Sequence, residues 1–214
     1  MSADRSDTGT IIIVDDDPAV RESMATLMRA AGYRTNTYSS GKELFQASIP
    51  EGPICLLLDL QLPGADGIEI QQSLIDNQQD LPVLFLTGHA DVPSAVTALR
   101  RGAIDYIEKM EFDPADLLRR VAGALKAHGR RLAERSARDR LYSRIAGLSP
   151  RELEVASLAA DGQTNKAIGL TLGISERTVE VHRGRAMKKL DLRTVADLAR
   201  LHAQLVRHGN LQSD

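Results

Sequence analysis

The sequence predicts an α/β domain with a doubly wound, five-stranded parallel sheet, followed by a helical linker and an all-α domain of four helices. In the first half, apolar runs alternate with helical patterns, which is typical of a parallel sheet. In the second half, short helices are separated by glycine turns. Residues 1–128 hold 11 Lys/Arg against 19 Asp/Glu, a net charge of −8, whereas residues 129–214 hold 16 against 10, a net charge of +6. This asymmetry indicates two domains with different partners and makes the basic one a candidate for nucleic-acid binding.

The composition of the 214 residues is that of an ordinary soluble globular protein. No apolar run approaches the roughly 20 residues that span a bilayer. Residues 1–10 are polar and lack the apolar core of a signal peptide, so we expect a disordered tail on a cytoplasmic protein that does not bind membranes. Cys55 is the only cysteine and lies in an apolar run, which favours core packing and excludes a disulfide within one chain.

The strands of the first domain are predicted from five apolar runs, at residues 11–14, 34–38, 54–58, 83–87 and 103–107. Helix signals stand between them: Asp17-Pro18 opens the first helix and Gly32 ends it, Ser40 caps the second, and Asp113-Pro114 opens the fifth. Right-handed crossovers place helices on both faces of a sheet with strand order 2-1-3-4-5.

The third run ends in Asp59, at the carboxyl end of a strand that reads as buried on both faces. Taken alone, this aspartate would more often cap a loop. Other polar residues follow the neighbouring strands, however: Asp15, Asp16 and Asp17 follow the first, Thr87 the fourth and Lys109 the fifth. The predicted strand order gathers them in one pocket. Clustered carboxylates repel one another unless a cation lies between them, and oxygen ligands beside solvent favour Mg²⁺.

The motifs at residues 13–17 (Ile-Val-Asp-Asp-Asp), 57–64 (Leu-Leu-Asp-Leu-Gln-Leu-Pro-Gly), 86–89 (Leu-Thr-Gly-His) and 105–109 (Asp-Tyr-Ile-Glu-Lys) carry a resemblance to the receiver domain of two-component response regulators, over residues 11–126. The resemblance implies that Asp59 accepts a phosphoryl group from a sensor histidine kinase. Such a protein is a phosphoacceptor with self-catalysed phosphotransfer and dephosphorylation, and is otherwise no enzyme. Mg²⁺ would be held by Asp16, Asp59 and the backbone carbonyl of Gln61, and Asp15 would complete the acidic pocket.

The same resemblance gives roles to residues around the phosphate. Lys109 would hold one phosphoryl oxygen and Thr87 another, and Tyr106 matches the switch aromatic that turns inward when the threonine moves. Without the resemblance, Tyr106 would be a half-buried strand aromatic. Gln61 and His89 stand at positions that tune the phosphate lifetime, although a loop histidine is more often plain surface.

One residue departs from the receiver pattern. The family usually follows its lysine with a proline in a cis peptide, and here the next residue is Met110. A cis bond before a non-proline residue costs about 3 to 4 kcal/mol, so we predict a trans bond. The loop before the fifth helix would then differ in shape, which affects the placement of Lys109 and its coupling to that helix.

The linker, residues 127–146, is predicted to be helical because the pattern that starts at Asp113 continues into a stretch of mixed charge. Gly129 is a candidate break in this helix. Two interpretations stay open: a seam between two copies of the chain, or a simple solvated connector.

The second half reads as four helices that contain a helix-turn-helix. Ser149, Pro150 and Glu152 mark the first start, the second helix covers residues 164–172, Ser175 caps the third at 176–190, and the fourth covers 194–206. On a helical wheel the third helix turns Val179, Ala186 and Leu190 inward, with Met187 at the margin. The opposite side carries Val181, Gly184, Arg185 and Lys188, bordered by Glu180 and Lys189. An exposed valine between cations fits a major groove, where Val181 contacts a thymine methyl, Arg185 reads guanine, and Lys188 and Lys189 neutralise phosphates.

Residues 147–206 also resemble the LuxR-type DNA-binding domain, through the motifs at 148–152 (Leu-Ser-Pro-Arg-Glu), 162–166 (Gly-Gln-Thr-Asn-Lys) and 172–182 (Leu-Gly-Ile-Ser-Glu-Arg-Thr-Val-Glu-Val-His). With the receiver in front, the chain resembles a FixJ/NarL-type response regulator, with a DNA-binding domain at 147–207 and a tail at 208–214. The resemblance places Asn165, Lys166 and Thr178 near the phosphate backbone and gives His182 a packing role. Glu180 and Gly184 replace a more usual lysine and a longer side chain, which shifts the expected base preference.

The predicted function is a transcription regulator switched by phosphorylation at Asp59. Phosphorylation would remodel the face formed by the fourth helix, the fifth strand and the fifth helix, and would promote a homodimer that binds two half-sites in double-stranded promoter DNA. RNA polymerase is a further expected partner.

Two alternatives remain. A haloacid dehalogenase also groups Asp, Thr and Lys around Mg²⁺, but it needs an acid where this chain has Gln61, and its motifs follow another order. The other alternative is a receiver that responds to a partner protein instead of phosphate.

Overall fold

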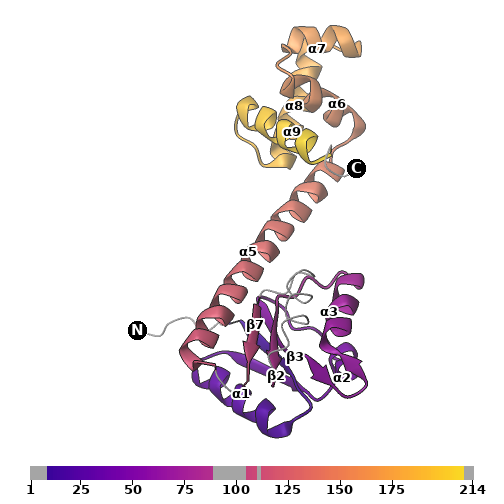
Figure 1. Cartoon of the computed structure of the whole chain (residues 1–214). Coiled ribbons are helices and arrows are strands. Elements are labelled where there is room, and N and C mark those ends of the chain that lie inside the picture. Colours follow the sequence, from indigo (N-terminus) through magenta and orange to yellow (C-terminus); the bar gives the residue numbers. More distant parts are fainter. Residues whose placement is uncertain (1–8, 89–104, 110–111, 210–214) are drawn as a thin grey trace. The chain divides into compact units, whose positions relative to one another are not determined.

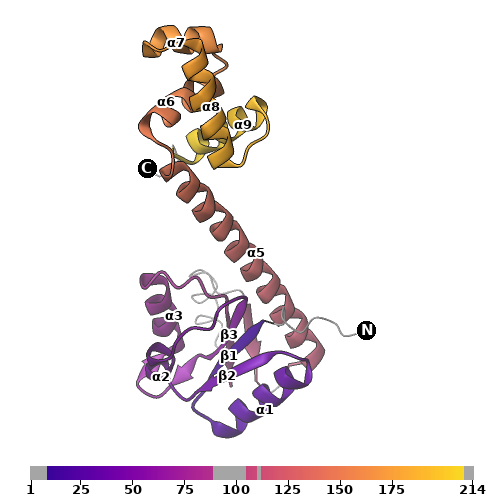
Figure 2. The same cartoon turned by 180° about the vertical axis from the view of Figure 1, so that it is seen from behind.

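The computed structural model describes residues 9–88, 105–109 and 112–209, and the chain divides into two compact units, Met1–Glu134 and Arg135–Asp214. Figure 1 shows both units, and Figure 2 shows them from behind. The expected fourth helix of the first domain, the role given to His89 and the trans bond expected at Met110 lie outside the described residues.

The first unit holds a sheet of the order β2-β1-β3-β6-β7, in which every neighbouring pair is parallel. Its strands are β1 (Thr10–Val14), β2 (Arg34–Tyr38), β3 (Ile54–Asp59), β6 (Val83–Thr87) and β7 (Asp105–Glu108). Every residue of β1, β3 and β6 is buried, as expected of apolar strands covered on both faces. The predicted strand order is therefore confirmed, and β1 begins at Thr10, one residue earlier than expected.

Helices cover both faces of this sheet: α1 (Pro18–Ala30) and the first part of α5 (Pro114–Ala146) on one face, and α2 (Gly41–Gln46) and α3 (Gly67–Asp76) on the other (Figures 1 and 2). Side chains alternate between the faces along each strand. Thus Ile12 packs towards α2 and α3, whereas Ile11, Ile13 and Cys55 pack towards α1 and α5. The predicted core role of Cys55 agrees with its complete burial.

A short hairpin that the sequence did not predict follows Asp59. It consists of β4 (Gln61–Leu62) and β5 (Ala65–Asp66) and turns at Gly64, which has a φ of 82°. The hairpin returns the chain to Gly67, where a Cβ atom would lie 2.4 Å from the carbonyl oxygen of Asp59. Only glycine allows this approach, so α3 begins directly against the end of β3.

Helix α5 continues through Gly129, so the break considered there does not occur. A Cβ atom at Gly129 would lie 3.2 Å from Cγ of Pro53, and the glycine thus lets α5 lie close to the segment before β3. One residue earlier, the buried His128 accepts a hydrogen bond at Nδ1 from the N–H of Ile54, with a donor–acceptor distance of 2.9 Å. Burial lowers the pKa of His128, although the carbonyl oxygen of Ile54, which lies 3.1 Å from the same Nδ1, opposes this shift.

The second unit contains α6 (Pro150–Ala160), α7 (Asn165–Leu172), α8 (Glu176–Leu190) and α9 (Val195–Gly209). The expected caps Ser149 and Ser175 each accept a hydrogen bond from a backbone N–H in the first turn of their helix, and Thr164, which was expected as the first residue of α7, caps that helix in the same way. The core of the unit gathers apolar residues of all four helices, and Leu141 and Ile145 at the end of α5 pack against it. No helix in the described part of the chain is long and apolar enough to cross a membrane.

Candidate phosphoacceptor site and DNA-reading surface

The acidic residues predicted to share a pocket do come together. Strands β1 and β3 pair in parallel with Val14 opposite Leu58, so Asp15 and Asp59 follow at the same edge of the sheet. One carboxylate oxygen each of Asp15, Asp16 and Asp59 lies within 4.8 Å of the others. Asp15 and Asp59 are 0% and 5% exposed, respectively, whereas Asp16 is open to solvent. The site is therefore a buried pair of acids with a third acid at its rim.

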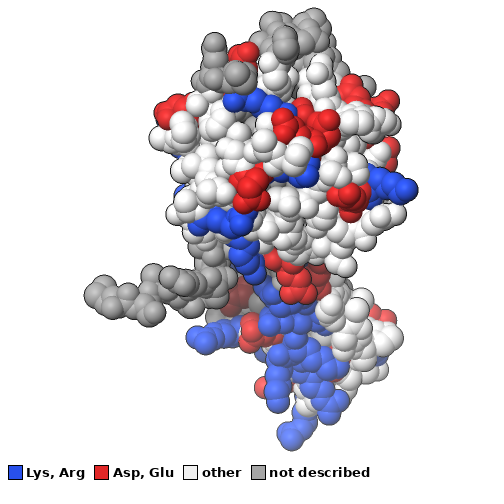
Figure 3. Space-filling model, turned by 90° about the horizontal axis from the view of Figure 1, so that it is seen from below, with Lys and Arg blue, Asp and Glu red and all other residues white. Residues whose placement is uncertain are grey.

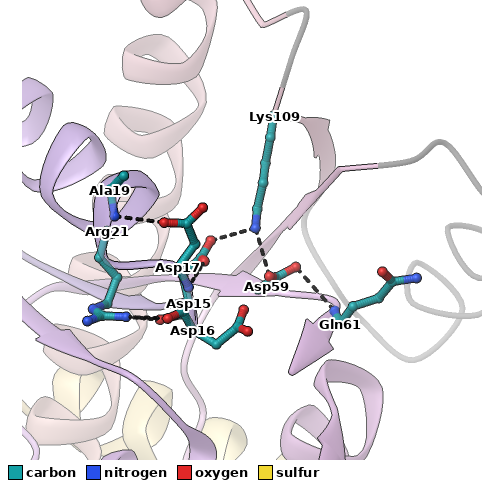
Figure 4. A network of polar contacts seen from close by, with 8 residues as sticks. All are labelled: Asp15, Asp16, Asp17, Ala19, Arg21, Asp59, Gln61 and Lys109. Atoms are coloured by element: carbon teal, nitrogen blue, oxygen red, sulfur yellow. Dashed lines mark hydrogen bonds and ion pairs between the residues drawn. The ribbon is translucent and has the colours of Figure 1, made fainter. Parts of the chain in front are cut away.

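Lys109 bridges the buried pair (Figure 4). Its Nζ lies 2.6 Å from Oδ2 of Asp15 and 2.7 Å from Oδ2 of Asp59. Burial raises the pKa of Asp59, and this effect outweighs the hydrogen bonds from Lys109 and from the N–H of Gln61, which lower it. Burial also lowers the pKa of Lys109, but the hydrogen bonds and charges of Asp15 and Asp59 outweigh it, so the net shift is upward. The lysine is thus held as a cation between the two acids.

Thr87 and Gln61 border the same acids. Asp59 pairs with Leu86 across the sheet, so Thr87 lies one residue further along, and its carbonyl oxygen accepts a 2.7 Å hydrogen bond from the N–H of Lys109. The N–H of Gln61 donates to Oδ1 of Asp59 at 3.1 Å, and its side chain points away from the acids in Figure 4.

Tyr106, the expected switch aromatic, lies on β7 opposite Phe85. It is half-buried and packs against the core between the sheet and the helices α2 and α3.

The donor set fits a hard divalent cation. Three carboxylates offer oxygen ligands, one of them beside solvent, and these are the ligands that Mg²⁺ prefers. Their mutual repulsion gives a cation a reason to bind, because Lys109 supplies a single positive charge against three acids.

Sequence reasoning missed Arg21, which shapes the acidic loop. Its Nη1 donates to the carbonyl oxygen of Asp15 at 2.6 Å and to that of Asp16 at 3.0 Å (Figure 4). The position of Arg21 four residues after Asp17, in the first turn of α1, was visible in the sequence. Its role could not be predicted, because its hydrogen-bond acceptors are backbone carbonyls, which residues of every type carry.

The second candidate site lies on α8. Val179, Ala186 and Leu190 are buried as predicted, and Met187 lies at the margin of the core. The predicted reading side is exposed, with Val181 at 45%, and Gly184, Arg185 and Lys188 are also classed as exposed. Nearby, Lys166 is exposed, and Asn165 and Thr178 are partly buried near the starts of α7 and α8.

The charged side chains are unevenly distributed over the surface drawn in Figure 3. Figure 3 shows one face with an area where Lys and Arg gather and another where acidic and basic side chains are interspersed.

Lys189 differs from the other predicted DNA contacts. Its Nζ donates to Oε2 of Glu152 at 2.6 Å and to the carbonyl oxygen of Gly147 at 3.1 Å. The positive charge of Lys189 is therefore already paired within the second unit.

Comparison with known proteins identifies the domains in which the two candidate sites lie. Residues 11–122 match the response regulator receiver domain, and residues 146–202 match the bacterial regulatory proteins of the luxR family. The chain belongs to the FixJ/NarL family of response regulators. It thus combines a receiver with a LuxR-type DNA-binding domain, and it is a two-component transcription regulator.

Individual relatives cover most of this response regulator. It is 42% identical over 198 residues to the C4-dicarboxylate transport transcriptional regulatory protein DctR of Rhodobacter capsulatus, over 90% of this chain and 98% of that protein. It is 37% identical to the transcriptional regulatory protein FixJ of Azorhizobium caulinodans, over 88% of this chain and 89% of that protein. Among solved structures, the response regulator StyR aligns with a TM-score of 0.86 and 36% identity, over 92% of this chain and 99% of that chain.

The family assignment confirms the predicted fold class and resemblance. A receiver domain implies a histidine kinase partner, and a luxR-family domain implies DNA binding. Receiver domains typically bind Mg²⁺, in line with the acidic cluster. The alternative of a haloacid dehalogenase finds no support, because the matched families are a receiver and a DNA-binding domain.

Proposed function

We propose that this response regulator is phosphorylated on Asp59 by a sensor histidine kinase, and that phosphorylation promotes a homodimer that binds promoter DNA. The observation that carries the proposal is the ammonium of Lys109 held between Asp15 and Asp59, beside the solvent-exposed Asp16. A buried carboxylate that borders both a cation and an open acidic rim can accept a phosphoryl group and stabilise it.

In the transfer, a carboxylate oxygen of Asp59 attacks the phosphorus of a phosphohistidine in line with the leaving nitrogen. The O–P bond forms as the P–N bond breaks, and the imidazole leaves with the electron pair and takes up a proton. Lys109 lies 2.7 Å from Asp59 and is placed to hold an oxygen of the new acyl phosphate. Mg²⁺, held by Asp16, Asp59 and the carbonyl oxygen of Gln61, with Asp15 completing the pocket, would neutralise charge on the phosphoryl oxygens. Attack by water on phosphorus would later restore the carboxylate, without an added enzyme.

The phosphate would be sensed through Thr87 and Tyr106. Thr87 lies beside Asp59 at the edge of the sheet and would donate a hydrogen bond from its hydroxyl to a phosphoryl oxygen. Tyr106 lies on the neighbouring strand and is only partly buried, and it would turn inward when Thr87 moves towards the phosphate. Gln61, whose side chain points away from the acids in Figure 4, would have to turn towards Asp59 to influence the access of water and hence the phosphate lifetime.

The output domain would read DNA with α8. Val181 and Arg185 would contact base edges in the major groove, whereas Lys188, and Asn165, Lys166 and Thr178 around the helix starts, would contact phosphates. A dimer binds two half-sites at once, which turns the modest affinity of each domain into strong operator binding, where RNA polymerase would be the next partner. The proposed boundaries are 11–126 for the receiver, 127–146 for the linker and 147–207 for the DNA-binding domain.

The test compares Asp59→Asn with Asp76→Asn, an exposed aspartate on α3 that serves as the control. With acetyl phosphate and Mg²⁺, wild type and the Asp76 variant should incorporate phosphate, dimerise in light scattering and bind DNA more tightly. The Asp59 variant should do none of these. Equal stimulation of the Asp59 variant would refute the proposal.

A second arm addresses a receiver that responds only to a protein partner. Beryllofluoride with Mg²⁺ should shift wild type to the dimer and change the set of genomic DNA fragments that it retains. If wild type ignores both acetyl phosphate and beryllofluoride yet binds DNA, phosphate is not its signal.

A further inference from the structure

We propose that Lys189 is a positioning residue that fixes the carboxyl-terminal end of the recognition helix α8 to the α5–α6 junction, and that Lys188 alone of the two lysines contacts DNA phosphate. The inference rests on the proposed DNA-binding function of α8. It changes the role that the sequence gives to Lys189.

The partner of Lys189 is a buried carboxylate. The side chain of Glu152 is 5% exposed, and its Oε2 accepts the Lys189 ammonium at 2.6 Å and the N–H of Ser149 at 2.8 Å. Ser149 in turn accepts from the N–H of Glu152 and caps α6. The lysine thus pairs with the carboxylate of a capping box, and its loss would leave a buried carboxylate without its cation.

Further contacts tie the same end of α8 to the end of α5. Lys189 donates to the carbonyl oxygen of Gly147, the residue just after α5. Arg144, in the last turn of α5, donates to the carbonyl oxygen of Leu190 at 3.3 Å and pairs with Asp191, which ends α8 in the left-handed region. Carbonyls at a helix end need such donors: Arg144 of α5 supplies one at the end of α8, and Lys189 of α8 supplies one just after the end of α5.

Lys188 is one residue earlier and faces another direction. On the wheel of α8, Lys188 lies about 20° from Val181, whereas Lys189 lies about 80° away, towards the buried side. Lys188 is exposed, and among the described residues its side chain has no ion pair or hydrogen bond. An unpaired cation on the reading side releases counterions from the DNA when it binds a phosphate, which makes the affinity depend on salt. A cation that is already neutralised by Glu152 contributes little to this salt dependence.

The arrangement has a functional consequence. Direct polar contacts join the junction between α5 and α6 to the end of α8. A displacement of the end of α5 would therefore move the recognition helix through these contacts as well as through the apolar core. Lys189 would therefore set how firmly α8 is held for reading DNA.

The first experiment measures the salt dependence of binding of the full chain to a short random-sequence DNA duplex by fluorescence anisotropy. Lys188→Gln should reduce the slope of log affinity against log salt by about 0.9, the value for one phosphate contact. Lys189→Gln should keep the wild-type slope. An equal loss of slope in both variants would overturn the proposal.

The second experiment follows hydrogen–deuterium exchange of the full chain in peptides that cover the last turn of α8 and the start of α6. Lys189→Gln and Glu152→Gln should each accelerate exchange there by about tenfold, the double variant should add little, and Lys189→Arg should restore protection. Lys188→Gln should match wild type. Unchanged exchange in Lys189→Gln would also refute the positioning role.

The exchange measurement needs no DNA. If wild type fails to bind any duplex while the exchange pattern appears as expected, the proposed DNA-binding function fails and the positioning contact stands.

Discussion

The two functional regions of this response regulator are built in opposite ways. The phosphoacceptor pocket holds its charges inside the protein, with Asp15 and Asp59 buried and joined by Lys109. The reading side of α8 places Val181 and Arg185 in solvent, above a core that they do not touch. Charges in the pocket depend on one another for stability, whereas charges on the proposed reading side would depend on a partner molecule.

The difference separates stability from function. A substitution in the pocket should change the folding free energy of the receiver along with its chemistry, because it removes one member of a buried charge cluster. A substitution on the reading side should change DNA binding and leave stability within about 0.5 kcal/mol. Lys189 is the residue that breaks this division, since it lies on the recognition helix but is bonded inward to Glu152.

The largest effect is expected for Lys109→Ala. Without the ammonium, the buried acids Asp15 and Asp59 lose their shared cation, and the receiver should lose about 3 kcal/mol of stability. Mg²⁺ should stabilise this variant more than it stabilises wild type, because the ion then supplies the only neutralising charge. Urea unfolding with and without Mg²⁺ measures both terms, and Lys42→Ala, at an exposed position on α2, is the control. A Lys109 variant as stable as the control would mean that the pocket tolerates unpaired acids.

A smaller effect is expected for Arg21→Gln, which removes the donor to the carbonyls of Asp15 and Asp16. Two effects oppose each other here. The guanidinium repels a metal ion, but only by about 1 kcal/mol or less through solvent. A hydrogen bond from a charged donor contributes about 1.5 to 3 kcal/mol to the order of the loop. Ordering should prevail, and Mg²⁺ affinity in calorimetry should fall about tenfold.

Two comparisons sharpen the Arg21 test. Arg29→Ala removes an exposed ion pair with Glu22 further along α1 and should not alter Mg²⁺ binding. Arg21→Lys keeps the charge but has a different donor geometry, so it should recover only part of the affinity. Tighter Mg²⁺ binding in Arg21→Gln would show that its charge, and not its hydrogen bonds, dominates.

Features of these regions that depend on neighbouring residues in the sequence could be predicted, and features that depend on contacts between distant residues could not. Asp15, Asp59, Thr87 and Lys109 each follow an apolar run, and parallel strands bring their carboxyl ends to one edge, so local patterns sufficed to place them together. The inward and outward faces of α8 also followed from its own periodicity.

Other features depend on contacts between distant residues, which local patterns do not encode. Lys189 and Glu152 are 37 residues apart, and His128 and Ile54 are 74 apart. Gly129 looked like a helix break because glycine is a poor helix former, but its value lies in the close approach of Pro53. Each of these needed the three-dimensional fold to become visible.

A pH titration tests the inward contact of the recognition helix. Hydrogen bonds from Lys189 and from the backbone of Ser149 lower the pKa of Glu152 from 4.5 to about 2. Because the folded carboxylate binds protons more weakly than the unfolded one, it adds stability above pH 4.5 that is lost as the pH falls towards 2. Glu152→Gln should be less stable than wild type at pH 7, and the difference should shrink across this interval in denaturation followed by circular dichroism. Glu154→Gln, at an exposed site on the same helix, should parallel wild type, and a constant difference for Glu152→Gln would contradict the assignment.

The smallest expected effect comes from adding one methyl group to a glycine in each helix of the helix-turn-helix, α7 and α8. Gly184 lies on the exposed side of α8, and a Cβ atom there would meet nothing within 4 Å. Gly184→Ala should therefore raise stability by about 0.5 to 1 kcal/mol through the lower backbone entropy of the unfolded chain. Gly169 on α7 is the matched opposite, since its Cβ atom would lie 2.7 Å from the carbonyl oxygen of Ile174. Gly169→Ala should lower stability in the same urea unfolding experiment, and a gain at both positions would show that the turn between α7 and α8 can widen without cost.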